Sequence, residues 1–241
     1  MFIEHEVYIG FRDVGYQNKI TNTAMIAYLE DAGGIHSNFA GYGLNDIDRT
    51  KKSWMLLDWK IELYKRPKYA DKIIIKTWSR KTNKIYAYRD FEIFNENREL
   101  IGIATSNWIL YDIEKQKITR LGEYIDEAYQ IEDAEVFENE KFEKLIEPEN
   151  YIEKANFKVS RNLIDVNNHV HNIYYMDIAN EVLPMNIYGQ TEFNKIRIMY
   201  KKGIKLNENV NVYYNTENEK YIISIKSEDN KDLHSIIILE K

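Results

Sequence analysis

The feature that most constrains the fold is a weak internal repeat with a spacing of 150 residues. Residues 14–31 read VGYQNKITNTAMIAYLED, and residues 164–181 read IDVNNHVHNIYYMDIANE. In both segments a short extended stretch leads into a helical pattern, which Asn22 and Asn172 begin at the same relative place. A chain of 241 residues is long enough for two such copies. The repeat therefore predicts a duplicated unit.

Each copy is predicted to contain one helix with a stripe along one face. The stripe residues recur every four positions, at Ala24, Tyr28 and Ala32 in the first copy and at Tyr174, Ile178 and Val182 in the second. Pro184 should end the second helix, because proline has no backbone N–H to donate and clashes with the preceding turn.

A run of strand-like sequence follows each helix. Leu57, Trp59, Ile61 and Leu63 alternate with charged residues, which is the period of a half-buried strand. The other candidate strands are 73–78, 85–94 and 101–111 in the first copy and 196–200, 210–214, 221–225 and 235–239 in the second. One long helix followed by an antiparallel meander, present twice, predicts an α+β fold.

We expect a first unit at residues 1–130 and a second at 151–241, joined by a connector at 131–150. Residues 132–149 are dense in Glu and Lys and contain Pro148. This composition is typical of a solvated segment with a short helical piece. We assign no chemistry to the connector.

Composition excludes several classes of function. The net charge of -6 argues against broad nucleic-acid binding, which needs a basic surface. The absence of cysteine removes disulfides, thiolate metal sites and a thiol nucleophile, so we expect oxygen or imidazole chemistry with neither cofactor nor metal. No stretch approaches the roughly 20 apolar residues of a membrane span. Glu4 and Glu6 argue against a signal peptide, so we expect a cytoplasmic protein.

The most informative segment is 165–172, which places polar side chains just ahead of the second helix: Asp165, Asn167, Asn168, His169, His171 and Asn172. One interpretation is that the Asp and Asn residues cap that helix. The other is that the helix N-terminus offers free N–H groups to an oxyanion, while the polar cluster supplies a base. Both interpretations are open on the residues alone.

The pattern Asp165-x-Asn167-x-His169-Val170-x-Asn172, continued through 174–181 and Pro184, closely resembles the catalytic segment of plant and bacterial acyl-acyl carrier protein thioesterases. Further landmarks of that family occur in order along the first half: Glu30, Asp31, Ala32, His36, Gly41, Gly43, Trp54, Arg66, Pro67, Asp71, Thr77, Trp78, Arg89, Asp90, Phe91, Ala104, Ser106 and Trp108. The resemblance therefore covers nearly the whole chain.

The resemblance implies a double hotdog fold and hydrolysis of fatty acyl-acyl carrier protein, which releases free fatty acid. It implies an acyl tunnel in the first hotdog and a catalytic site in the second. Asp165 would activate water or attack the thioester carbon, His169 would act as its acid/base partner, and Asn167 would orient substrate or water. Which of its two roles Asp165 takes is open.

Three positions depart from the family pattern. His171 stands where the family usually has asparagine, and we expect it to face the surface. Gly203 stands where the family has a catalytic glutamate, and Ile204 where some plant members have cysteine. Gly203 predicts a slower enzyme that Gly203→Glu would accelerate, unless a sharp backbone turn requires the glycine. Acyl-CoA hydrolysis and a weakly active acyl-binding protein are the alternative functions.

The implied partner, acyl carrier protein, is acidic, so docking should use basic residues. Two groups follow equivalent strands, namely Lys65, Arg66 and Lys68 in the first half and Lys201, Lys202 and Lys205 in the second. We expect a packing or hydrogen-bonding role for His36, and we interpret His5 and His234 as ordinary strand or surface residues. The oligomeric state is open, with a homodimer as one option.

Overall fold

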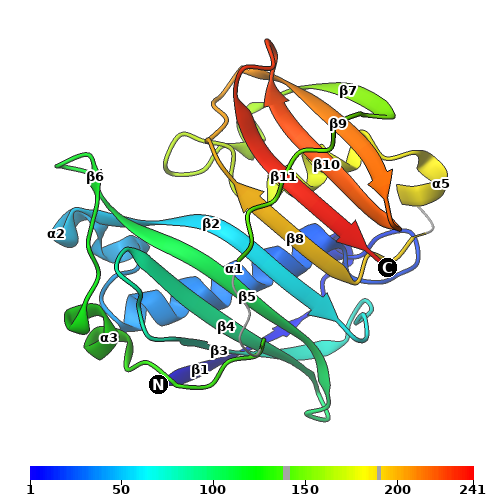
Figure 1. Cartoon of the computed structure of the whole chain (residues 1–241). Coiled ribbons are helices and arrows are strands. Elements are labelled where there is room, and N and C mark those ends of the chain that lie inside the picture. The colour runs from blue at the N-terminus through cyan, green and yellow to red at the C-terminus, as the bar shows by residue number, and fades with distance from the viewer. Residues whose placement is uncertain (138–141, 189–190) are drawn as a thin grey trace. The chain divides into compact units, whose positions relative to one another are not determined.

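The computed structural model describes residues 1–137, 142–188 and 191–241. The chain forms two compact units, Met1–Phe142 and Glu143–Lys241 (Figure 1). Each unit pairs an antiparallel sheet with helical segments, as the repeat predicts.

The first unit holds five main strands and one long helix. In chain order its elements are β1 (Phe2–Tyr8), the 3-10 turn η1 (Phe11–Asp13), α1 (Asn22–Phe39), η2 (Leu44–Asp46), α2 (Ile47–Thr50), β2 (Lys52–Leu63), β3 (Lys72–Ser79), β4 (Tyr86–Asn95), β5 (Leu100–Asp112), β6 (Lys117–Ile118) and α3 (Glu123–Tyr129). Its strands are ordered β1-β3-β4-β5-β2, and β6 pairs with β5.

The second unit repeats this plan with shorter helices. Its elements are β7 (Glu153–Lys158), η3 (Arg161–Leu163), α4 (Tyr174–Asn180), α5 (Met185–Tyr188), β8 (Lys195–Tyr200), β9 (Asn209–Glu217), β10 (Lys220–Ser227) and β11 (Leu233–Glu240). The strand order is β7-β9-β10-β11-β8. Strand for strand this is the order of the first unit, so the duplication predicted from the sequence is confirmed at the level of topology.

Helix α1 packs one face on its sheet, but the face differs from the predicted stripe. The buried residues are Met25, Ile26, Leu29, Ala32, Gly33 and His36. Of the predicted stripe only Ala32 is buried, while Ala24 and Tyr28 are half-buried. Tyr28 reaches the helix edge, where its hydroxyl donates to Asp13 Oδ2 at 2.6 Å. The larger aliphatic side chains form the core because each gains roughly 1.5–3 kcal/mol when buried.

The second helix is shorter than predicted. Helix α4 begins at Tyr174 rather than Asn172 and ends at Asn180, where the prediction extended it to Pro184. Its N-cap, Ile173, offers no side-chain acceptor, whereas the Thr21 hydroxyl accepts the N–H of Ala24 at the start of α1. Pro184 prevents continuation at the other end. The helix is therefore short because its start has no side-chain cap and Pro184 stops its continuation.

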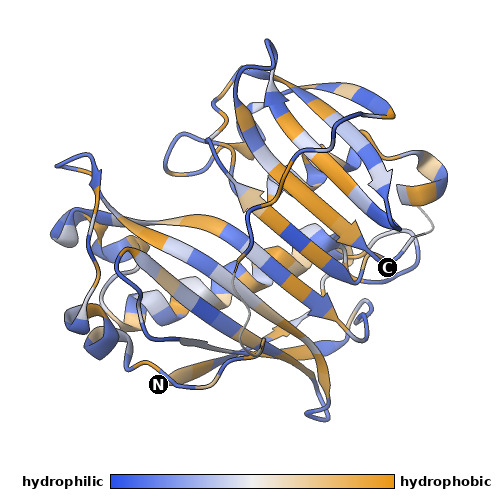
Figure 2. Ribbon diagram, viewed as in Figure 1, coloured by the Kyte–Doolittle hydropathy of each residue, from blue (hydrophilic) through white to orange (hydrophobic). Residues whose placement is uncertain are grey.

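The predicted strands are present, and β2 interrupts the predicted alternation. Hydrophobic and hydrophilic residues alternate along much of the sheets (Figure 2). In β2, Trp59, Ile61 and Leu63 are buried as predicted, but the register with β5 shifts between Leu56 and Asp58. This β-bulge leaves Leu57 half-buried and turns the carboxylate of Asp58 inward, where Asn107 Nδ2 donates to it at 3.1 Å.

The first strand of each unit has no counterpart in the predictions. These are β1 and β7, which pair at the edges of the two sheets with β3 and β9. One face of each is exposed and the other is half-buried, so their sequences are rich in charged residues. Charged edge strands resist edge-to-edge pairing with other chains. Because they contain few apolar residues, they lack the apolar alternation from which strands are predicted.

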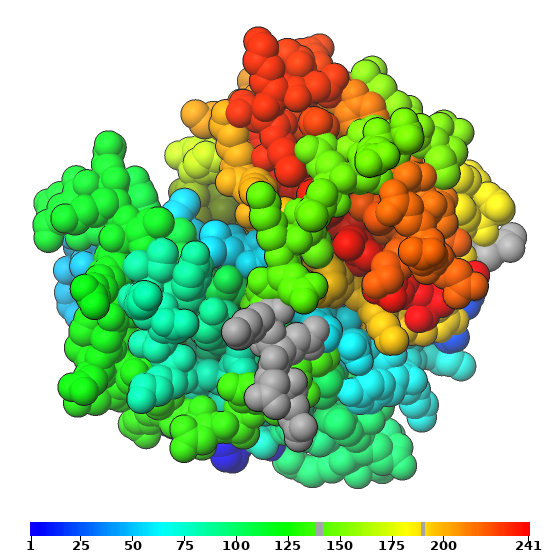
Figure 3. Space-filling view, viewed as in Figure 1, coloured from blue at the N-terminus to red at the C-terminus, as the bar shows by residue number. Residues whose placement is uncertain are grey.

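The connector predicted at 131–150 is divided between the units. Residues 132–136 lie on the first unit, where Trp78 Nε1 donates to the carbonyl of Ala134 at 2.8 Å and Val136 N–H donates to Asp90 Oδ2 at 3.0 Å. This segment runs over the surface of the unit (Figure 3). The described parts of the connector, 131–137 and 142–150, contain no helix, so the predicted helical piece is wrong there. Residues 138–141 lie outside the described residues.

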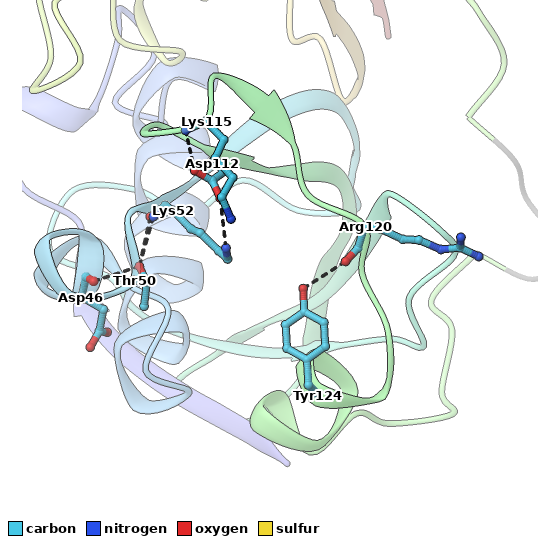
Figure 4. Close-up of polar contacts among 7 residues, drawn as sticks. All are labelled: Asp46, Thr50, Lys52, Asp112, Lys115, Arg120 and Tyr124. Carbon is cyan, nitrogen blue, oxygen red and sulfur yellow. Dashed lines mark hydrogen bonds and ion pairs between the residues drawn. The ribbon is translucent and has the colours of Figure 1, made fainter.

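Polar contacts join the end of β5 to the start of β2 in the first unit. Asp112 at the end of β5 accepts the backbone N–H of Lys115 at 2.9 Å, and the amino group of Lys52 at the start of β2 lies 3.5 Å from its carboxylate (Figure 4). Nearby, Tyr124 donates to the carbonyl of Arg120 at 3.0 Å. These contacts hold the β2 and β5 ends and the start of α3. Within the described residues, no helix is long and apolar enough to cross a membrane.

Candidate active site

The predicted catalytic segment forms a closed loop ahead of α4. The N–H of Asp165 donates to the carbonyl of His169 at 2.8 Å, and the N–H of Asn168 donates to the carbonyl of Asp165 at 3.1 Å. Asn168 has a φ of 61°, a left-handed conformation that asparagine tolerates better than most residues. The sequence Asp-x-Asn-Asn-His thus folds locally because its turn position carries asparagine.

The carboxylate of Asp165 is held by its own loop. Its Oδ1 accepts the N–H groups of Asn167 at 2.8 Å and of His169 at 3.2 Å. Its Oδ2 accepts the side-chain amide of Asn167 at 3.2 Å. Asp165, Asn167 and His169 are therefore brought together, and Asp165 contacts the backbone of His169 rather than its ring.

The imidazole of His169 is half-buried and packs against a second loop, residues 201–205. A Cβ placed on Gly203 would lie 2.6 Å from Cδ2 and 3.1 Å from Cγ of the ring. Among the described residues no hydrogen bond reaches the ring nitrogens, since the bond between His169 and Asp165 is made by the backbone N–H of His169. The ring can therefore offer a nitrogen to a bound molecule.

Backbone hydrogen bonds join the two loops. The N–H of Val170 donates to the carbonyl of Ile204 at 2.8 Å, and His169 pairs with Lys205 in an isolated antiparallel bridge. Loop 201–205 is held in turn by β11, since the N–H of Lys201 donates to the carbonyl of His234 at 2.8 Å. The His169 ring and Gly203 are therefore placed by strand pairing, not by local sequence.

The start of α4 has neither the side-chain cap nor the free N–H groups that the two interpretations expect. The N-cap of α4 makes no side-chain hydrogen bond, so Asp165 and the asparagines do not cap it. The first-turn N–H groups also have partners: Tyr174 donates to His171, Tyr175 to Asn172 and Met176 to Ile173, at 3.0–3.3 Å. These N–H groups are not free for an oxyanion, and the seven residues of α4 provide little dipole.

The first unit contains the same loop without the carboxylate and the imidazole. The N–H of Gly15 donates to Lys19 at 2.9 Å, that of Asn18 to Gly15 at 3.0 Å, and that of Ile20 to Pro67 at 2.9 Å. These bonds reproduce those of Asp165, Asn168 and Val170, and Asn18 also has a left-handed φ, 55°. Glycine and lysine thus occupy the places of Asp165 and His169, so only the second unit carries a carboxylate and an imidazole here.

The remaining histidines differ in their surroundings. His171 is half-buried rather than surface-facing, with its ring centroid 6.1 Å from that of Tyr174. His36 is fully buried, and its Nδ1 lies 2.7 Å from Nη1 of Arg89, which confirms a hydrogen-bonding role. Burial and the charge of Arg89 lower the pKa of His36 to about 3. His234 is buried on β11, where its Nδ1 lies 2.9 Å from the carbonyl of Lys202.

Two of the six basic residues proposed for docking are used internally. Arg66 donates to the carbonyl of Ile20 at 2.8 Å and to Oδ1 of Asn22 at 2.5 Å. The amino group of Lys202 lies 2.5 Å from Asp232 Oδ2. Lys202 is nevertheless exposed, and so are the other four, whose amino groups no ion pair within the described residues reaches: Lys65, Lys68, Lys201 and Lys205.

Protein-family models match both units. The model of the acyl-ACP thioesterase N-terminal domain matches residues 3–129, and that of the acyl-ACP thioesterase C-terminal domain matches residues 146–238. The chain is 24% identical over 224 residues to oleoyl-acyl carrier protein thioesterase 1 of Arabidopsis thaliana chloroplasts, covering 86% of this chain and 62% of that protein. It is 20% identical over 202 residues to a chloroplastic palmitoyl-acyl carrier protein thioesterase of Cuphea hookeriana, covering 79% of this chain and 49% of that protein. The chain thus spans less than two thirds of the length of these relatives.

Solved structures share the fold over nearly the full chain. An acyl-ACP thioesterase from Bacteroides thetaiotaomicron superposes with a TM-score of 0.87 at 17% identity, covering 99% of this chain and 97% of the other. The 12:0-ACP thioesterase from Umbellularia californica gives 0.87 at 14% identity, covering 99% and 96%. The α+β double hotdog fold is thereby confirmed. With both domain models matched along the chain, this protein belongs to the acyl-ACP thioesterase family.

Proposed function

We propose that the protein hydrolyses the thioester of fatty acyl-acyl carrier protein and releases free fatty acid for fatty acid biosynthesis. One observation carries this proposal beyond family membership. The loop of the second unit holds a hydrogen-bonded carboxylate, Asp165, and an imidazole, His169, whose nitrogens have no partner among the described residues. The equivalent loop of the first unit has neither group. The chemistry is therefore assigned to the second unit.

In the proposed reaction Asp165 acts on the thioester carbon, either directly or through a water whose proton it takes. In the water route the carbon–sulfur bond breaks, His169, protonated at the start, gives its proton to the departing thiolate, and the proton on Asp165 then passes back to His169. In the direct route an acyl anhydride forms on Asp165 as the carbon–sulfur bond breaks, His169 protonates the thiolate, and a water then hydrolyses the anhydride and reprotonates His169. Asn167 reinforces the orientation of the carboxylate, since both its backbone N–H and its amide donate to Asp165. Water is the only co-reactant, and the products are a carboxylic acid and a thiol.

The partner in this proposal is acyl carrier protein, and the place of action is the cytoplasm. Because the carrier is acidic, unpaired cations should contribute to its capture. Lys201 and Lys205 fit that role, since they lie on the loop that contacts His169 and their amino groups have no ion-pair partner in the described chain.

One observation favours a second candidate, a weakly active acyl-binding protein. The family's glutamate is replaced by Gly203, and the place of a side chain there is taken by the ring of His169. A site without that carboxylate could bind acyl groups and turn over slowly. Co-purified fatty acid together with negligible hydrolysis would favour this candidate.

The test is a release assay over a panel of saturated and unsaturated acyl chains, each presented on acyl carrier protein and on coenzyme A. The proposal expects the larger kcat/KM for the carrier-protein thioesters. A larger kcat/KM for the acyl-CoA series would assign the protein to acyl-CoA hydrolysis. Absence of release from every substrate, with fatty acid bound to the purified protein, would leave the acyl-binding function.

A further inference from the structure

The duplication allows the active-site loop to be compared with a copy that has no reactive groups. Strand pairing sets the correspondence: Ile20 bonds to Pro67 as Val170 bonds to Ile204. The bridge of Lys19 with Lys68 matches that of His169 with Lys205. By this alignment Gly203 takes the place of Arg66, one residue before Pro67 and Ile204.

In the first unit the residue at this place ties the two loops together. Arg66 donates to the carbonyl of Ile20 at 2.8 Å and to Oδ1 of Asn22 at 2.5 Å, which joins the second loop to the start of α1. Glycine at 203 cannot make this tie. It instead leaves the space that the His169 ring occupies, as the 2.6 Å separation of a hypothetical Cβ from Cδ2 demonstrates.

In the second unit a different residue supplies the tie. Tyr175 is 3% exposed and corresponds, at the spacing of 150, to Met25 of α1, which has no hydroxyl. The phenol oxygen of Tyr175 accepts the N–H of Ile204 at 3.2 Å and donates to the carbonyl of Lys202 at 3.4 Å. These two residues flank Gly203. The hydroxyl therefore holds the backbone on both sides of the residue against which His169 packs.

The surroundings keep this hydroxyl available as a donor. Burial raises the pKa of Tyr175 above its ordinary value, so the phenol stays protonated at neutral pH. The ring is fixed by an edge contact with Tyr200, whose centroid lies 5.2 Å away. His234 Nδ1, 2.9 Å from the carbonyl of Lys202, supports the same loop from β11.

We infer that Tyr175 is a positioning residue for His169: its hydroxyl takes over the tie that Arg66 makes in the first unit, so that position 203 can be glycine and receive the imidazole. The inference rests on the proposed function for its catalytic consequence. Its structural part, the orientation of His169 by loop 202–204, can be measured without turnover.

The test uses the full chain with Tyr175→Phe, which removes the hydroxyl and keeps the ring. Tyr175→Met, which copies Met25, serves if the first variant does not fold. Tyr214→Phe is the matched control, because Tyr214 is 4% exposed in the same unit and its hydroxyl lies 2.6 Å from that of Thr216, away from both loops. The readouts are kcat and KM on acyl-acyl carrier protein and the imidazole NMR signals of the five histidines, with His169 assigned through His169→Gln.

The expected result for Tyr175→Phe is a kcat lowered roughly 10-fold with KM within about twofold, since a small displacement of a reacting group reduces rate more than binding. The His169 signals should shift, while Tyr214→Phe changes neither readout. Unchanged His169 signals, or an equal effect of Tyr214→Phe, would overturn the inference. If the parent hydrolyses no thioester, the proposed function has failed, and the His169 signals alone decide the positioning role.

Discussion

The imidazole of His169 lies directly against the backbone of Gly203. It is so close that residue 203 has no room for a Cβ. A Cβ at 203 would be 2.6 Å from Cδ2 and 3.1 Å from Cγ of the ring. Gly203 does not have a left-handed φ, whereas Gly41 does, so a sharp turn is not what requires the glycine. The requirement comes from the ring, which fills the place where a side chain would start.

Substitution at Gly203 should therefore lower activity. Gly203→Ala adds only the Cβ and must displace the His169 ring, so turnover should fall roughly 10-fold or more. Gly203→Glu meets the same contact, and we now expect a loss where the sequence alone suggested a gain. Turnover and melting temperature of both variants give the answer. A turnover above the parent's for Gly203→Glu, together with a lowered turnover for Gly203→Ala, would contradict this prediction. It would mean that the His169 ring moves readily and that the added carboxylate assists hydrolysis.

Loss of the reactive groups should abolish most turnover without unfolding the loop. Asp165→Asn keeps Oδ1 as acceptor for the N–H groups of Asn167 and His169, and loses the charge and the acceptor for the side-chain amide of Asn167. This variant and His169→Ala should each lower turnover by about 100-fold or more. Lys19→Ala, at the equivalent place in the first unit, is the control and should stay near the parent. Near-normal turnover of both site variants would refute the assigned site.

Asp165→Ala should differ from Asp165→Asn in stability. The alanine variant leaves the N–H groups of Asn167 and His169 without their side-chain acceptor, whereas the asparagine variant retains one. A lost hydrogen bond typically costs about 0.5–1.5 kcal/mol. Urea unfolding should therefore rank the parent and Asp165→Asn above Asp165→Ala. Identical midpoints for the two variants would mean that the loop does not depend on this acceptor.

Docking should depend on Lys201 and Lys205 more than on Lys202. Reversal of the first two to Glu should lower kcat/KM for acyl-acyl carrier protein and weaken its salt dependence, with little change for a small acyl thioester. Lys202 already pairs with Asp232 at 2.5 Å, so Lys202→Glu also breaks an internal contact and should affect both substrates alike. Equal losses on both substrates for the Lys201 and Lys205 reversal would reject this loop as the docking surface.

His36 should make the fold sensitive to acid. Its pKa is lowered to about 3 from an ordinary 6.5 by burial and by the neighbouring Arg89. Between these values the unfolded chain binds a proton that the folded chain does not, so the stability contribution is present above pH 6.5 and is lost as pH falls toward 3. In the plot of melting temperature against pH, His36→Gln should therefore reduce the slope between pH 6.5 and 3. Parallel curves for parent and variant would show that other groups dominate the acid response.

The sequence by itself determined the duplicated α+β plan and singled out the segment that we propose as the active site. The repeat at 150 residues, the alternation in strands such as β2, and the Asp-x-Asn-x-His pattern are all local signals, because period and turn residues report the conformation of a single segment. The same signals misjudged the buried face of α1 and the length of α4. Packing against the sheet decided the buried face of α1, and the missing N-terminal cap together with Pro184 decided the length of α4. Hydrophobic periodicity reports neither of these.

Only the tertiary structure decided how the site is assembled. His169 meets Gly203 because the N–H of Val170 bonds to the carbonyl of Ile204, and Tyr175 reaches the same loop from α4. The sequence groups Arg66 and Lys202 with the residues expected for docking, yet Arg66 donates to the carbonyl of Ile20 and Lys202 pairs with Asp232. These contacts join residues far apart in the chain, and their geometry follows from strand order and register. A linear pattern can name such residues, but it does not contain the distances between them.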